Sequence, residues 1–146
     1  MHNKTLSLLD AENLVAGPIT TPDHVRQLRD ELDSKVGALG LTVCGVSAAP
    51  ELFHFHAAWE GVRLVQKKGA DGAERAIEEF MLRHYPMGSL ERLVILSGDH
   101  YFADLASRYK ATGASIDVVA REGSLSQQLR AVADRVTLLP RLVYAA

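Results

Sequence analysis

The chain has 146 residues, of which 47% are hydrophobic and 23% are charged, and its formal net charge at pH 7 is −2. This composition excludes a disordered or low-complexity chain, and the length predicts a single domain over residues 1–146. The near-neutral charge excludes a global attraction to nucleic acid, so such binding has to depend on a local basic patch.

The sequence contains no apolar run of the roughly 18 residues that span a bilayer and no signal-peptide pattern. It therefore predicts a cytoplasmic protein with no membrane partner. The single cysteine, Cys44, lies within an apolar run, which predicts a core position in a reducing compartment.

Short apolar runs alternate with helical patterns along the whole chain. Most of these runs are continuously apolar, which is typical of parallel strands covered on both faces. Strands are predicted at residues 6–9, 41–46, 62–65, 93–96, 116–119 and, more weakly, 135–139. Repeated β-α units of this length predict an α/β fold with a doubly wound, mostly parallel sheet and helices on both faces.

The predicted helices follow from capping residues and apolar stripes. Thr21 and Pro22 mark the start of the first helix, and a short helix is predicted at residues 51–59 after Pro50. Further helices are predicted at residues 70–84 and 101–111, and a last one begins at Ser124. In the helix at 70–84 the inward stripe ends with Phe80, Met81 and His84.

Acidic side chains follow three of the predicted strands. Asp10 ends the first strand and is followed by Glu12 and Asn13, Asp71 comes shortly after the third, and Asp99 follows the fourth in the stretch LSGDHYF. In a doubly wound sheet, ligands bind beyond the carboxyl ends of the strands. The pattern therefore predicts a site at that edge where carboxylates share a divalent cation, because such cations prefer oxygen ligands.

The helix after the third strand extends this acidic pattern. Asp71, Glu74 and Glu78 lie on one helical face, and Asp71 in the first turn is favoured by the helix dipole. For Glu78 the solvated face of an amphipathic helix is the preferred interpretation, whereas Asp71 is assigned to the site.

Three motifs in register with these strand ends carry a family resemblance. The sequences LLDAENL, KKGADGAE and LVILSGDHYF, taken together, resemble the NYN domain family of PIN-like nucleases over nearly the whole chain. Asp10 and Asn13 match the family's Asp-x-x-Asn element, and Lys68, Gly69 and Asp71 match its Lys-Gly-x-Asp element. Ser97 and Asp99 match its Ser-Gly-Asp element.

The resemblance implies a three-layer, Rossmann-like fold with strand order 3-2-1-4-5, and a ribonuclease that depends on Mg²⁺ or Mn²⁺. Asp10, Asp71 and Asp99 are then the catalytic, metal-binding residues. RNA is the implied partner, with Lys67 and Lys68 holding its phosphates; a solvated strand end is the alternative interpretation of this lysine pair. The supporting residues are Asn13, Glu74, Ser97, His100 and Asp104.

One position departs from the family pattern. Where the pattern has a second acid after Asp99, this chain has Tyr101, and His100 or Asp104 is the candidate to replace it. Three carboxylates suffice for one Mg²⁺ with its retained waters. This departure motivates an alternative interpretation, in which the chain is a catalytically weakened or inactive PIN-like domain that binds RNA or protein.

Other patterns in the sequence do not predict a further site. His54 and His56 diverge on a helix and lack further zinc ligands, and no phosphate-loop or hydrolase-elbow motif is present. A receiver-like signalling domain would need an aspartate directly after the third strand, where this chain has Gln66 and two lysines. The aromatic residues Phe53, Phe55 and Trp59 are interpreted as core or as contacts of a homodimer.

Overall fold

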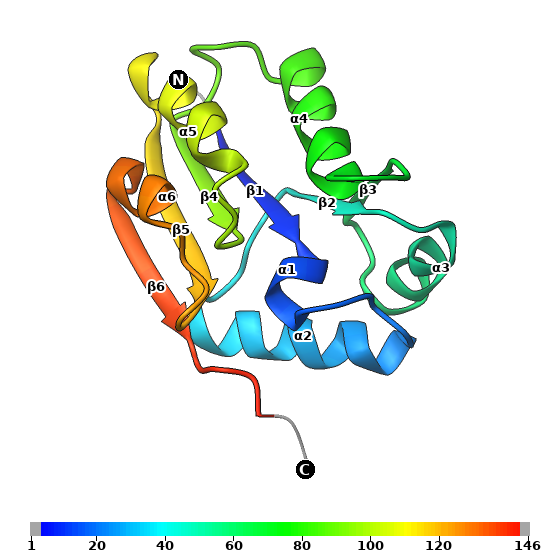
Figure 1. Cartoon of the computed structure of the whole chain (residues 1–146). Helices are drawn as coiled ribbons and strands as arrows, with labels where there is room; N and C mark the ends of the chain where they lie inside the picture. The colour runs from blue at the N-terminus through cyan, green and yellow to red at the C-terminus, as the bar shows by residue number, and fades with distance from the viewer. Residues whose placement is uncertain (1–3, 144–146) are drawn as a thin grey trace.

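A six-stranded, all-parallel sheet with helices around it forms the molecule, and the computed structural model describes residues 4–143 (Figure 1). The strand order is β3-β2-β1-β4-β5-β6. The strands are β1 (Thr5–Asp10), β2 (Thr42–Val46), β3 (Arg63–Gln66), β4 (Arg92–Leu96), β5 (Ser115–Arg121) and β6 (Arg135–Leu139).

The observed order differs from the expected 3-2-1-4-5 by the sixth strand. β6 pairs in parallel with β5, with Val136 opposite Val118 and Leu138 opposite Ala120. This pairing satisfies backbone groups that β5 would expose as an edge strand. The weak strand predicted at residues 135–139 is therefore a full member of the sheet.

The helices are α1 (Ala11–Val15), α2 (Pro22–Lys35), α3 (Ala49–Ala58), α4 (Gly72–His84), α5 (Phe102–Ala111) and α6 (Gln127–Val132). Thr21 caps α2 as predicted, because its hydroxyl accepts a hydrogen bond from the His24 amide at 3.1 Å. The prediction for the last helix was wrong: Ser126, rather than Ser124, is the residue before α6, and its hydroxyl accepts from the Leu129 amide. Helix α1 was not predicted, since five residues are too few for a periodic pattern.

Two hydrophobic clusters pack against the sheet. Leu8 belongs to one cluster and Leu9 to the other, as expected for neighbouring residues of a strand, whose side chains point to opposite faces. The first cluster includes buried residues of α4, α5 and α6, and the second includes buried residues of α2 and α3. Among residues 4–143, no helix is both long and apolar enough to cross a membrane.

Several single-residue predictions can be compared with this core. Cys44 is fully buried as predicted, and so is Phe55, whereas Phe53 is exposed. His84 was placed on the inward stripe of its helix, and this was wrong: the side chain is exposed at the last turn of α4.

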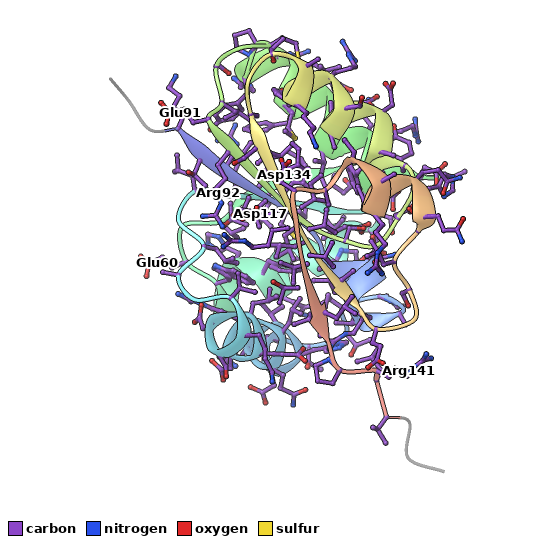
Figure 2. The ribbon with its side chains drawn as sticks, turned by 90° about the vertical axis from the view of Figure 1, so that its left-hand side faces the viewer. Glu60, Glu91, Arg92, Asp117, Asp134 and Arg141 are labelled. Atoms are coloured by element: carbon purple, nitrogen blue, oxygen red, sulfur yellow. The ribbon has the colours of Figure 1, made fainter. Side chains whose placement is uncertain are left out.

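Ion pairs tie distant segments together at both ends of the sheet. Arg121, at the end of β5, is almost fully buried, forms a two-pronged pair with Glu31 of α2 and donates to the carbonyl oxygens of Leu14 and Pro140. At the other end, Arg92 of β4 pairs with Asp117 of the neighbouring β5 (Figure 2).

Gly45 of β2 allows α4 to lie directly against the sheet. A Cβ atom at this position would stand 2.4 Å from the Ala73 carbonyl oxygen and 2.6 Å from Cγ1 of Ile77. Because the nearest atom belongs to the backbone, α4 itself would have to move. The missing side chain therefore fixes the height of the first turn of α4 above the strands.

We expect Gly45→Ala to destabilise the protein by about 1–3 kcal/mol, the usual cost of overpacking. Urea denaturation followed by circular dichroism measures this loss. Ser107→Thr is the control, because it adds one carbon on an exposed helical position and should cost only a few tenths of a kcal/mol. Equal stability of both variants would contradict close contact between α4 and β2.

Candidate metal centre

Three carboxylates converge at the carboxyl edge of the sheet. Asp10 ends β1, Asp99 follows β4, and Glu74 lies in the first turn of α4; ligand oxygens of the three lie within 4.8 Å of one another. β1 and β4 are neighbours in the sheet, so their ends deliver Asp10 and Asp99 to the same place. Glu74 approaches from the helix that Gly45 holds close.

Asp10 is the most enclosed member of this cluster. Its side chain is fully buried, and its Oδ2 accepts a hydrogen bond from the Ser97 hydroxyl at 2.9 Å. Its Oδ1 is buried and has no hydrogen-bond partner of normal geometry among the described residues; the nearby backbone amide of Asn13 is the weakest of the influences on the pKa of this carboxyl, which it lowers. A buried carboxylate oxygen without a partner is costly, and it is the atom of this cluster that most needs a ligand.

The loop that carries Asp99 is held in place from several sides. The Asp99 amide donates to the Ser97 hydroxyl oxygen at 3.1 Å, and the Gly98 amide donates to Oδ1 of Asn13 at 3.0 Å. A Cβ atom on Gly98 would lie 2.2 Å from the Ser124 carbonyl oxygen, so only glycine fits here. Ser97 and Asn13, both predicted as supporting residues, thus connect the ends of β1 and β4.

The turn before α4 decides which acid faces the cluster. Asp71 has a left-handed backbone with φ of 53° and is exposed, and the helix begins after it at Gly72. The side chain of Asp71 lies outside the group of converging ligand atoms, and Glu74 is the acid of this helix that joins Asp10 and Asp99. The sequence had assigned Asp71 as the ligand and Glu74 as its support.

The remaining predicted site residues are not members of the converging group. His100 is exposed, with Nδ1 3.4 Å from Oδ1 of Asp99. Asp104 is exposed on α5 and is not a member of the converging group. Lys67 forms an ion pair with Glu79, and Lys68 is exposed.

Tyr101 occupies the position where the motif led us to expect an acid. Its amide donates to Oδ1 of Asp99 at 2.9 Å, and its hydroxyl donates to Oε1 of Glu78 at 3.4 Å. Burial, followed by the charge of Glu78, raises the pKa of the Tyr101 hydroxyl, so this side chain stays protonated and supplies no negative charge.

Two further carboxylates near the site were not assigned a role from the sequence. Glu12 accepts hydrogen bonds from the amide and the hydroxyl of Ser47, which follows β2. Glu51 is buried, and its Oε2 accepts from the Ile19 amide at 3.0 Å. An acid directly after a Pro near a helix start is an ordinary first-turn signal, so nothing in the sequence marked Glu51 as buried.

Burial and mutual repulsion both disfavour negative charge in the cluster. Burial, followed by the charge of Glu74, raises the pKa of Asp10 from its ordinary value of 3.8 to about 7. Burial, followed by the charges of Asp99, Asp71 and Glu12, raises the pKa of Glu74 against a lowering contribution from its own backbone amide. A cation placed among these oxygens would relieve the repulsion.

The donor set fits a divalent metal ion. Three carboxylates offer hard oxygen atoms in close proximity, one of them the unpartnered Oδ1 of Asp10. Mg²⁺ and Mn²⁺ use such oxygen ligands and complete their coordination with water. Asp10, Glu74 and Asp99 are the residues that can hold the ion.

The raised pKa of Asp10 predicts how metal-free stability depends on pH. The folded protein keeps the Asp10 proton up to about pH 7, whereas the unfolded chain releases it near its ordinary value, so stability falls as the pH rises through this window. Each pKa unit corresponds to about 1.4 kcal/mol, so the loss reaches about 4 kcal/mol. Thermal melting in EDTA should show this decline, and Asp10→Asn should remove most of it.

The same group links metal binding to pH. Because the ion requires the deprotonated carboxylate, added Mn²⁺ should raise the melting temperature more at about pH 8 than at about pH 6. Asp10→Asn should show little response to Mn²⁺ at either pH. A wild-type response that is independent of pH would contradict ligation by Asp10.

Comparisons with known proteins bear on the fold and the family of the chain. A search of curated proteins finds no match. The fold is similar to the crystal structure of a protein of unknown function, VPA0982, from Vibrio parahaemolyticus RIMD 2210633, with a TM-score of 0.59, 18% identity and 94% of each chain covered. The model of the NYN domain, a PIN-like fold whose members are generally nucleases, matches residues 8–140. The chain therefore belongs to the NYN domain family.

Proposed function

We propose that this protein is a ribonuclease that hydrolyses RNA phosphodiester bonds with the help of Mg²⁺ or Mn²⁺. One observation carries the proposal: in a NYN domain, a buried carboxylate oxygen of Asp10 has no partner and lies in a cluster with Glu74 and Asp99. Packing alone gives no reason to bury carboxylates that repel one another, because an uncompensated buried charge is destabilising. The same cluster is suited to holding a cation beside a phosphate.

The three carboxylates have distinct tasks in this proposal. Asp10 supplies a rigid ligand, because burial and Ser97 fix its orientation. Asp99 and Glu74 are only partly buried, so they face the side from which a substrate approaches. The bound ion supplies Lewis acidity that lowers the pKa of water and offsets the negative charge of the reacting phosphate.

Ser97 and Asn13 act as positioning residues. The Ser97 hydroxyl donates to Asp10 and accepts from the Asp99 amide, so one side chain sets the relative orientation of two ligands. Asn13 holds the Gly98 amide. Groups that orient metal ligands in this way commonly change metal affinity by about 10–100-fold when they are removed.

The lysines after β3 differ in how readily they can contact RNA. Lys68 is exposed, whereas the ammonium of Lys67 pairs with Glu79. We therefore assign the phosphate contact next to the cluster mainly to Lys68, with Lys67 available when Glu79 exchanges partners. Phosphate contacts of this kind weaken with added salt.

A second candidate function is a binding module that has lost the cutting step. Tyr101 motivates it, because a neutral side chain occupies the position of the expected acid and bonds to Glu78 instead. With three carboxylates the site suits one metal ion, and hydrolysis would then be slow. Binding of RNA without cleavage in any metal would favour this candidate.

We expect the purified protein to cleave labelled single-stranded RNA in Mn²⁺ or Mg²⁺ and to leave it intact in EDTA. Asp10→Asn and Asp99→Asn should abolish cleavage, because each removes a ligand charge without changing side-chain size. Gel analysis of the RNA products over time measures this. Asp30→Asn, the same change on an exposed residue of α2, is the matched control; cleavage that survives both aspartate substitutions at the cluster would rule out this centre.

The roles of Glu74 and Asp71 can be separated by measuring Mn²⁺ binding. Glu74→Gln should weaken Mn²⁺ binding by about 10–100-fold or more, a loss at least as large as that for an outer group. Asp71→Asn should bind Mn²⁺ nearly as well as the wild type, because asparagine tolerates the left-handed backbone. Titration calorimetry measures both; the opposite ranking would restore Asp71 as the ligand.

A further inference from the structure

Two adjoining hollows lie between the edge strand β3 and helix α4, away from the metal centre. They have volumes of about 810 and 270 Å³ and share Arg63, Phe80 and His84 in their walls. The larger one reaches Lys4 and Thr5 at the amino edge of the sheet. The smaller one reaches Lys67 at the carboxyl end of β3, so together they form a continuous groove along the length of this strand.

The groove is basic although the whole chain is slightly acidic. Its charged lining consists of one acid, Glu79, and the cations Lys4, Arg63, Lys67 and Arg83, together with His84. Glu79 pairs with Lys67 and lies 3.7 Å from Arg83. Arg63 and Arg83 are exposed, and a single acid cannot neutralise the four cations. The excess of positive charge makes the groove complementary to a polyanion.

Aromatic side chains form part of its wall. The rings of Phe80 and His84 lie 4.6 Å apart, and the guanidinium of Arg63 lies over Phe80 at 5.4 Å. Tyr85 follows at 6.2 Å from Phe80. Alternating cations and ring faces suit a single-stranded nucleic acid, whose phosphates need charge and whose bases need planar surfaces.

The groove and the metal centre lie on two sides of the same helix. β3 is an edge strand with no described strand on its outer side, and α4 runs back beside it (Figure 1). Glu78 faces Tyr101 on one side of α4, while Glu79 faces Lys67 on the other. Helix α4 therefore separates the cluster from the groove, and the exposed Lys68 directly follows Lys67 of the groove.

We propose that the groove between β3 and α4 binds single-stranded RNA. Arg63, Arg83 and Lys4 contact its phosphates, and a base stacks on the ring of His84. The inference rests on the proposed function, because the bound strand is the continuation of the substrate beyond the metal centre. It adds an anchoring site that determines the length of RNA the protein prefers.

Binding without cleavage tests the groove directly. The probe is a fluorescent oligouridylate of about 15 nucleotides, within the usual site size, titrated in EDTA at several salt concentrations with anisotropy as the readout. Arg63→Ala combined with Arg83→Ala should weaken binding and reduce the slope of log affinity against log salt by about 1.4, or about 0.7 per lost phosphate contact. His84→Ala should lower affinity about fivefold or more without changing that slope at about pH 8.

The matched control removes two exposed arginines at the opposite edge of the sheet. Arg130→Ala combined with Arg135→Ala changes the net charge equally and should leave the salt slope unchanged. Lys4→Gln, on an exposed residue before β1, provides a second groove variant if the arginine pair lowers the melting temperature. An unchanged slope in the groove variants, or an equal change in the control, overturns the proposal.

Cleavage in Mn²⁺ separates this inference from the proposed function. If both hold, the arginine pair raises KM for the long RNA and leaves kcat unchanged. Weakened binding in EDTA with no cleavage by the wild type supports the groove and rejects the nuclease. If the wild type cleaves RNA with metal, and the groove variants keep the same RNA affinity and the same KM, the groove does not bind RNA and the nuclease proposal is unaffected. A peptide ligand of the groove would give this same result.

Discussion

The buried carboxyl of Asp10 is the constraint on which the site depends. It ends the central strand β1 at a depth where water cannot solvate a charge, and a single hydroxyl from Ser97 compensates one of its oxygens. The neighbouring segments hold this carboxyl in place. The hydrogen bond between Gly98 and Asn13 joins the ends of β4 and β1, and α4 covers the cluster. Burying this carboxyl beside Glu74 and Asp99 costs stability, and such costs are typical of functional sites.

Helix α4 connects the site to the rest of the molecule. Its first turn supplies Glu74, its buried face packs on β2 over Gly45, and its last turns line the basic groove. A helix held along one side by close packing moves as a unit. The position of Glu74 therefore depends on packing contacts along the whole helix. Gly45 helps to position Glu74 although it has no side chain that could take part in the site.

The sequence predicted the sheet and two of the three carboxylates of the cluster because both follow from periodicity and strand ends. Asp10 and Asp99 terminate apolar runs that pair side by side. The third carboxylate depended on where α4 begins, and the left-handed Asp71 shifted that start by two residues. The Asp-Gly pair at 71–72 is a turn signal and could have placed Glu74 correctly. Neither the burial of Glu51 nor the orientation of Tyr101 toward Glu78 follows from local sequence, because each depends on segments distant in the chain.

The hydrogen bond from Ser97 to Asp10 joins residues 87 positions apart. Closing so long a loop carries a large entropic cost, and contacts of high sequence separation slow folding. The segment between β1 and β4 contains α1, α2, β2, α3, β3 and α4. A half-folded chain therefore has dispersed carboxylates and no metal-binding cluster. The three carboxylates come together only once β1 has paired with β4 and α4 has packed over β2.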